Sequence, residues 1–214
     1  MIDKIEILIL TLPIFLLSIS FHEYMHAWAA DKLGDPTART AGRLTINPRS
    51  HLDPVGLVMF ILAVLFAGFF IGWAKPVPVN RHYFRQPRRD FALVSIAGPM
   101  ANLIQAYVWY ALLYLVLLVT GPFPSLGMAI VLNFLRLGVI VNIILLCFNL
   151  IPVPPLDGSR VLAWLLPARH AQVLDRIEPF GFFIILMLLW TGILGRIYVP
   201  MMQLVLWMFP KIGG

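Results

Sequence analysis

The chain has 214 residues, of which 60% are hydrophobic and 12% are charged, and its mean hydropathy is +0.88. Soluble domains carry about a quarter charged residues, so this composition excludes an ordinary soluble protein and indicates a membrane protein. The 16 Lys and Arg outnumber the 10 Asp and Glu, but they flank apolar segments instead of forming one patch. That distribution argues against a nucleic-acid partner and for the positive-inside orientation of a protein in lipid. The single cysteine, Cys147, excludes an internal disulfide and is expected to be a small buried residue.

Long apolar stretches follow one another along the chain, and about 20 residues suffice to span a bilayer. They are Ile5 to Leu33, Pro54 to Trp73, Phe91 to Thr120, Met128 to Ile151 and Pro179 to Phe209. Gly192, Gly195 and Pro200 leave the last stretch open as one kinked helix or as a short helix followed by an interfacial one. We predict an all-α polytopic membrane protein with four to six membrane segments, folded as a single domain over residues 1–214 and surrounded by membrane lipid.

The first apolar stretch could be a membrane anchor or a cleaved signal peptide, because Ala27-Trp28-Ala29 loosely resembles a cleavage site. The preceding Asp3, Lys4 and Glu6 do not form the positively charged region of a signal peptide. Cleavage after Ala29 would also remove the most specific chemical motif in the chain. We therefore expect an anchor.

Basic residues indicate which loops face the cytoplasm. They gather in residues 34–53, in residues 75–90 and after Ile151, whereas the link from Gly121 to Gly127 is uncharged. We expect this link outside the cell and the three basic segments inside it. A full crossing by residues 54–73 would put two basic segments on opposite sides, so we favour a re-entrant path, with short extended elements near the active site. Such a path is tolerated where the backbone lines a protein cavity.

His22-Glu23-Tyr24-Met25-His26 matches H-E-x-x-H, in which two His on one helical face present their ring nitrogens to one zinc ion. Glu23 can take a proton from the zinc-bound water, whose pKa the metal lowers to about 7. The alternative is an accidental match with both His satisfied inside a helix. Ionisable side chains are costly in an apolar membrane helix and mark function, so we predict a site for one zinc ion with Glu23 as the catalytic base.

A catalytic zinc takes three protein ligands and a water. The third His of the longer metzincin motif would fall at Lys32, and the only later glutamate, Glu178, lies in a charged stretch. An aspartate is therefore favoured, but Asp31 lies on the opposite face of the first helix. Asp53 and Asp157 remain. Asp157 follows three prolines that end the preceding helix, and its spacing fits a metal ligand and a helix N-cap equally well.

Depth in the membrane gives an independent expectation about Asn102. His22 lies 11 positions before the expected end of its helix, and Asn102 lies 11 positions after Phe91. At about 1.5 Å per residue, both lie about 16 Å from the cytoplasmic end, and Gly98 and Ala101 allow close helix packing. We therefore expect the two helices to meet beside the metal. Asn102 could hold a metal ligand or a substrate backbone group, or form an interhelical hydrogen bond without a catalytic role.

Three motifs in this order resemble the site-2 protease family of intramembrane metalloproteases, and the match extends over most of the chain. They are H-E-x-x-H in the first helix, Gly98-Pro99-x-x-Asn102, and Asn149-Leu150-x-Pro152-x-Pro154-x-Leu156-Asp157-Gly158. The resemblance implies that the substrate is a transmembrane helix of a membrane protein, cut within or near the bilayer, as in regulated intramembrane proteolysis.

The resemblance also implies roles for individual residues. It implies that His22, His26 and Asp157 bind zinc and that Glu23 activates water, and it thereby selects Asp157 over Asp53. Asn149 occupies the asparagine position of the late motif, where it would contact the substrate backbone or the developing oxyanion. A role at the helix end remains the alternative for Asn149.

Residues 51–54 and 72–80 resemble a compact bacterial and archaeal branch of this family that lacks a PDZ domain. The resemblance implies a prokaryotic cell (inner) membrane, and the depth counted from the basic loops places the active site toward its cytoplasmic side. The alternating prolines of residues 75–79 favour an extended strand that could pair with an unwound substrate, or else a rigid surface turn. Two other functions compete. A catalytically silent zinc-binding scaffold or chaperone is disfavoured by the intact Glu23, and a metal transporter by the lack of internal repeats.

Overall fold

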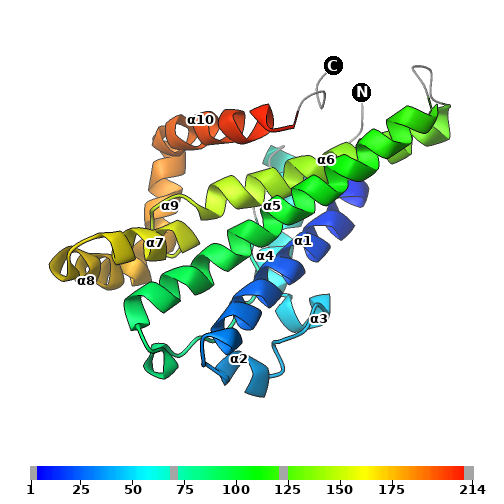
Figure 1. Cartoon of the computed structure of the whole chain (residues 1–214). Helices are drawn as coiled ribbons and strands as arrows, with labels where there is room; N and C mark the ends of the chain where they lie inside the picture. The colour runs from blue at the N-terminus through cyan, green and yellow to red at the C-terminus, as the bar shows by residue number, and fades with distance from the viewer. Residues whose placement is uncertain (1–3, 68–71, 121–124, 210–214) are drawn as a thin grey trace.

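The structure is a computed structural model, and it describes residues 4–67, 72–120 and 125–209 (Figure 1). Within these ranges the chain forms helices and no sheet, which confirms the predicted all-α class. Three of the described helices are long and apolar enough to cross a membrane, or four if one sharply bent helix pair counts as a span. Four is the lower limit of the predicted number. The predicted outer link falls mostly on residues 121–124, which lie outside the described residues.

The three long helices form the body of the molecule. They are α1 (Lys4–Lys32), α5 (Pro87–Thr120) and α6 (Leu126–Asn149). Each contacts the other two, and they run alongside one another in alternating directions (Figure 1). Many aliphatic side chains of α5 point away from the protein, as expected of helices that face lipid; Val119, for example, is 81% exposed. The membrane-helix composition therefore yields an up-and-down bundle.

The segment after α3 (Pro48–His51) folds back on itself. Asp53 caps α4 (Pro54–Leu62) by accepting a hydrogen bond from the Gly56 N–H at 2.8 Å, and a π-helical turn, η1 (Ala63–Ala67), follows. Together with the start of η1 the helical run covers Pro54–Phe66 and rises about 20 Å, which is still short of a hydrocarbon core of about 30 Å. Leu52 and Ala74 then form an antiparallel bridge. Because the segment returns to where it began, it has the geometry of the predicted re-entrant path.

The remaining short elements gather mostly where α1 ends and α5 begins (Figure 1). They are α2 (Thr37–Thr40), η2 (Arg81–Tyr83), α7 (Asp157–Leu165), α8 (Ala168–Ile177) and η3 (Glu178–Phe180). Residues 75–80 form no regular strand: they run between the Leu52–Ala74 bridge and η2 as an irregular segment. Helix α7 packs on α5, so the bundle end is closed by segments that are far apart in the sequence.

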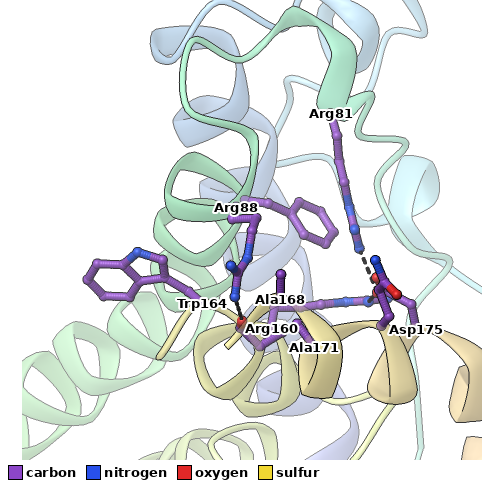
Figure 2. A pocket seen from close by; sticks show the side chains of 10 residues that line it. Arg81, Arg88, Arg160, Trp164, Ala168, Ala171 and Asp175 are labelled. Atoms are coloured by element: carbon purple, nitrogen blue, oxygen red, sulfur yellow. Dashed lines mark hydrogen bonds and ion pairs between the residues drawn. The ribbon is translucent and has the colours of Figure 1, made fainter. Parts of the chain in front are cut away.

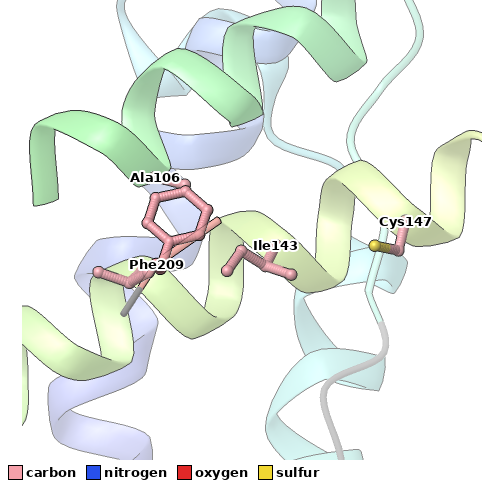
Figure 3. Close-up of a cluster of buried hydrophobic side chains, with 5 residues drawn as sticks. Ala106, Ile143, Cys147 and Phe209 are labelled. Carbon is pink, nitrogen blue, oxygen red and sulfur yellow. The ribbon is translucent and has the colours of Figure 1, made fainter. Parts of the chain in front are cut away.

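The last apolar stretch consists of two helices, α9 (Gly181–Trp190) and α10 (Ile193–Trp207). The helical run Ala168–Trp190, whose last part is α9, meets α10 at an angle of 83°. The break lies at Thr191 and Gly192, and Gly192 has a left-handed φ of 72°. Helix α10 folds back over α6, and Phe209 beyond it joins a buried cluster with Ala106, Val139, Ile143 and Cys147 (Figure 3). Cys147 is buried, as expected.

Candidate metal centre

Three side chains from α1 and α7 converge on one point. Nε2 of His22 lies 2.9 Å from Nε2 of His26, and Oδ2 of Asp157 lies 3.2 Å and 3.3 Å from these two nitrogens. The donor atoms of a tetrahedral zinc ion, with bonds of about 2.0–2.1 Å, are about 3.3 Å apart. The triangle therefore has the size of one face of a zinc coordination tetrahedron, and its donors, two imidazoles and a carboxylate, suit zinc.

Asp157 is the first residue of α7, and its carboxylate faces the two His instead of capping the helix. Its Oδ2 is buried and has no hydrogen-bond partner among the described residues apart from the imidazole nitrogens that it faces. Burial by itself raises the pKa of this carboxyl, but the imidazoles outweigh burial and hold the pKa below its usual range. An oxygen that faces two imidazole nitrogens and accepts no other hydrogen bond has its lone pairs available for a metal ion.

The glycine after Asp157 lets α7 start close to the end of α6. A Cβ atom at Gly158 would lie 2.7 Å from the carbonyl oxygen of Ile151 and closer still to that of Leu150. No larger residue fits there without moving the backbone of this loop. The Asp-Gly pair therefore places the carboxylate where α6 ends, beside the middle of α1.

Both His use their other ring nitrogen to bind helix α5. Nδ1 of His26 lies 2.8 Å from the carbonyl oxygen of Val94, and Nδ1 of His22 lies 2.6 Å from Oδ1 of Asn102. A carbonyl oxygen can only accept, so His26 carries its proton on Nδ1 and leaves Nε2 free for a metal, an arrangement common among metal-bound His. The expected meeting of the two helices is confirmed. Asn102 is fully buried and contacts His22 instead of lining the cavity.

Gly98 of α5 lies directly against the two imidazoles of α1. A Cβ atom at this position would lie 2.6 Å from Nε2 of His22 and closer still to Nε2 of His26. The expectation that Gly98 permits close packing is confirmed, and the packing takes place directly against the two imidazoles.

Glu23 lies beside the triangle and is half-buried. Its carboxylate has a donor atom within 4.8 Å of those of both His, so distance alone would admit it as a ligand. However, Oε2 of Glu23 accepts a hydrogen bond from the backbone N–H of Val77 at 3.0 Å. Asp157 is the closer carboxylate to both nitrogens and accepts no backbone hydrogen bond of this kind, so of the two carboxylates it is better placed to complete a metal site.

The triangle opens into a cavity of about 370 Å³. Its walls include Glu23, Val77 and Val79 from the first half of the chain and Asn149 and Arg160 from the second half. Nδ2 of Asn149 donates to the carbonyl oxygen of Leu145 at 2.9 Å. Because an amide nitrogen carries two hydrogens, one remains for a ligand in the cavity.

The competing aspartates lie elsewhere. Asp53 is occupied as the N-cap of α4, and Asp31 pairs with Arg39 on the surface. Asp157 alone of the three faces the His pair among the described residues.

Arg160, one turn after Asp157, connects α7 to its neighbours. It forms ion pairs with Asp175, at 3.0 Å, and with Glu178. Arg81 of η2 reaches the same oxygen of Asp175 at 3.4 Å (Figure 2). Arg160 and Phe91 line both the metal-site cavity and a second cavity of about 130 Å³. The ion pairs therefore hold the helix that carries Asp157.

Sequence reasoning missed Asn142 and the backbone of Val77. Asn142 lies on α6, is fully buried and contacts Asn102. A lone amide within an apolar helix was the available signal, because such a group needs a partner inside the protein. A backbone N–H leaves no signal in the sequence.

Comparison with known proteins connects the site to a chemistry. The model of peptidase family M50 matches residues 119–192, which include Asn149 and Asp157 but not the His22 motif. The provisionally named zinc metalloprotease YwhC of Bacillus subtilis is 40% identical over 192 residues, covering 88% of this chain and 83% of the relative. The provisionally named zinc metalloprotease Rip2 of Mycolicibacterium smegmatis is 31% identical over 212 residues, covering 98% and 76%. A similarly named protein of Methanocaldococcus jannaschii is 30% identical over 145 residues, covering 67% and 64%. No solved structure matches the chain.

Proposed function

The chain belongs to peptidase family M50, the family of the site-2 proteases, and is a zinc metalloprotease; we propose that it cuts membrane-spanning or membrane-anchored proteins within or near the bilayer. It is an integral membrane protein by the length and composition of its helices. One observation carries the proposal. The donors from His22, His26 and Asp157 converge on a cavity beside Glu23, well inside a helix apolar enough to span a membrane.

In this proposal, one zinc ion is held by Nε2 of His22, Nε2 of His26 and Oδ2 of Asp157. When bound, zinc supplies a Lewis acid and lowers the pKa of a water, which is the chemistry of a metalloprotease. Glu23 takes a proton from the attacking water as the water oxygen bonds to the scissile carbonyl carbon. Glu23 then gives the proton to the amide nitrogen as the carbon–nitrogen bond breaks, so that a carboxylate and an amine leave.

Two elements of the cavity wall are suited to a substrate backbone. The remaining N–H of Asn149 can donate to the oxygen of the scissile carbonyl, where negative charge develops. Pro76, Val77 and Val79 line the same cavity. The carbonyl groups of Lys75 and Pro76 accept from Arg43 and the Val77 N–H donates to Glu23, so an unwound substrate would pair with the backbone from the Val77 carbonyl onward. Unwinding is necessary because a helix uses its carbonyl groups in its own hydrogen bonds.

The depth of the site supports its orientation in the membrane. His22 lies ten residues before the end of α1 at Lys32, about 15 Å along the helix axis. The basic residues of η2, α7 and α8 lie at this end of the bundle, which by the positive-inside rule is the cytoplasmic one. We therefore propose that the active site lies toward the cytoplasm. The similarity to bacterial and archaeal proteins supports a prokaryotic cell membrane, inner where there are two.

Glu23→Gln tests the mechanism. The variant keeps the size of the side chain and all three metal donors but loses the base. We expect unchanged zinc content in the purified protein and no cleavage of membrane substrates. Substrates are found by comparing the membrane-protein fragments of cells that express the native chain with those of cells that express Glu23→Gln. Continued fragment formation in the variant would refute the role of Glu23. If cells that lack the protein altogether contain the same fragments as cells with the native chain, the alternative function, a catalytically silent zinc-binding scaffold, would be favoured.

A further inference from the structure

A chain of hydrogen bonds leads from His22 across the bundle to α6. Oδ1 of Asn102 lies 2.6 Å from Nδ1 of His22, and Nδ2 of Asn102 donates to Oδ1 of Asn142 at 3.1 Å. Nδ2 of Asn142 donates in turn to the carbonyl oxygen of Gly138, one turn earlier in α6, at 2.9 Å. Both asparagines are fully buried, and neither lines the metal-site cavity.

The last hydrogen bond fixes the donor and acceptor roles in the whole series of bonds. The Gly138 carbonyl can only accept a hydrogen bond, so Asn142 must turn its nitrogen toward it. The oxygen of Asn142 then faces Asn102, which must turn its own nitrogen toward Asn142. The oxygen of Asn102 is thus left to face His22, where it can only accept. His22 must therefore carry its proton on Nδ1, and the lone pair of Nε2 is free to bind a metal.

We propose that Asn142 is a positioning residue of the metal site, acting through Asn102 to set the tautomer of His22. This inference rests on the proposed role of His22 as a zinc ligand. Without Asn142, the amide of Asn102 can rotate by half a turn and offer its N–H to His22. Nδ1 of His22 would then have to accept, and its proton would move to Nε2, the atom that must bind zinc. Asn142 prevents this rotation of the Asn102 amide although it does not itself contact His22.

Zinc affinity of the purified full-length chain tests the proposal without a substrate. The dissociation constant is measured by competition with a zinc chelator in detergent. Asn142→Leu keeps the approximate size of the side chain and removes both hydrogen bonds. Loss of an outer-shell partner typically weakens metal binding about 10- to 100-fold, and for Asn142→Leu we expect the lower end of about tenfold.

Gln105 offers a matched control. It lies on α5 one turn after Asn102, is similarly buried, and donates to the carbonyl oxygen of Ser18 on α1 at 3.3 Å. Gln105→Leu therefore removes a buried interhelical amide contact of α5, this one to α1, without touching the hydrogen bonds that lead from His22 to Asn142. We expect it to leave zinc affinity within about twofold of the native value. Equal loss of affinity in Asn142→Leu and Gln105→Leu would overturn the proposal, because packing alone would explain both.

A double-mutant cycle tests whether Asn142 acts through Asn102. Once Asn102→Leu has been made, adding Asn142→Leu should change zinc affinity no further, whereas independent effects would multiply. Multiplying effects would refute the proposed route. Asn142→Asp provides a second variant if Asn142→Leu fails to fold. A protonated aspartic acid can donate to Gly138 and accept from Asn102, so its zinc affinity should stay close to native. A loss in this variant matching that of Asn102→Leu would also refute the route.

The same measurements separate this inference from the proposed site. His22→Ala should abolish the zinc binding, and retained zinc in that variant would refute the site itself. If His22→Ala loses zinc while Asn142→Leu behaves like Gln105→Leu, only the role of Asn142 is wrong.

Discussion

The backbone N–H of Val77 donates to Oε2 of Glu23 at 3.0 Å, although 54 positions separate the two residues in the sequence. The bond ties the proposed base to the segment that follows the re-entrant hairpin. It also leaves the other carboxylate oxygen, Oε1, available for a proton from water. The position of the base therefore depends on an element that is remote from the H-E-x-x-H helix.

Val77→Pro removes this hydrogen bond while leaving Glu23 in place. Residue 77 lies between two prolines in an irregular segment, so another proline is compatible with a chain already restricted to extended conformations. A hydrogen bond to a charged group contributes about 1.5–3 kcal/mol, so kcat/KM for a membrane substrate should fall about 10- to 100-fold. Zinc content should not change. Val77→Ala keeps the N–H and should retain most activity; if both variants lose activity equally, the side chain of Val77 matters and the bond does not.

Gly98→Ala should disrupt the metal site from the opposite helix. Its methyl group would overlap the imidazoles of His22 and His26, and either α1 and α5 separate or the rings rotate away. We expect the purified variant to bind zinc at least tenfold more weakly, as measured by chelator competition. Gly127→Ala is the control, because a Cβ atom there meets nothing within 4 Å. Native affinity in Gly98→Ala would contradict the packing seen here.

Asp157→Asn tests the third ligand. The amide keeps the shape of the side chain but loses the negative charge that binds zinc, so we expect a large loss of zinc from the purified protein. Asp53→Asn is the matched control, since asparagine caps a helix about as well as aspartate does. Elemental analysis of both proteins gives the zinc content per chain. A full complement of zinc in Asp157→Asn would mean that another group completes the site.

Arg160→Met should loosen the helix that carries Asp157. The methionine fills much of the same space but cannot pair with Asp175 or Glu178. Both acids are partly exposed, so the loss of stability should be modest, about 1 kcal/mol. Zinc affinity should fall several-fold as α7 becomes less well held. Arg81→Met removes the longer contact to Asp175 and the stacking of the Arg81 guanidinium on Phe91, but it leaves both ion pairs of Arg160 in place, so its zinc affinity should stay near native. A greater loss of zinc affinity in Arg81→Met than in Arg160→Met would contradict the role given to Arg160.

Sequence periodicity predicted the features that lie within one helix. Residues four apart share a helical face, so the pairing of His22 and His26 needed no tertiary structure. The constant rise per residue placed His22 and Asn102 at the same depth, and the 2.6 Å contact between them confirms this. The charge distribution around residues 54–73 favoured a re-entrant path, and the bridge between Leu52 and Ala74 agrees with it.

The sequence by itself therefore determined the class of protein, the apolar helices and one helical face with two imidazoles and a carboxylate. Spacing allowed both Asp157 and Asp53, and the resemblance to the site-2 proteases implied Asp157; the tertiary structure brings Asp157 to this face and leaves Asp53 as a helix cap. Only it showed that Asn102 faces His22, that Asn142 orients Asn102, and that Val77 contacts Glu23. The physical reason is that local periodicity is set by backbone geometry, whereas contacts between distant segments depend on how whole helices pack. A backbone N–H or a buried amide acquires its role only through the neighbour that this packing provides.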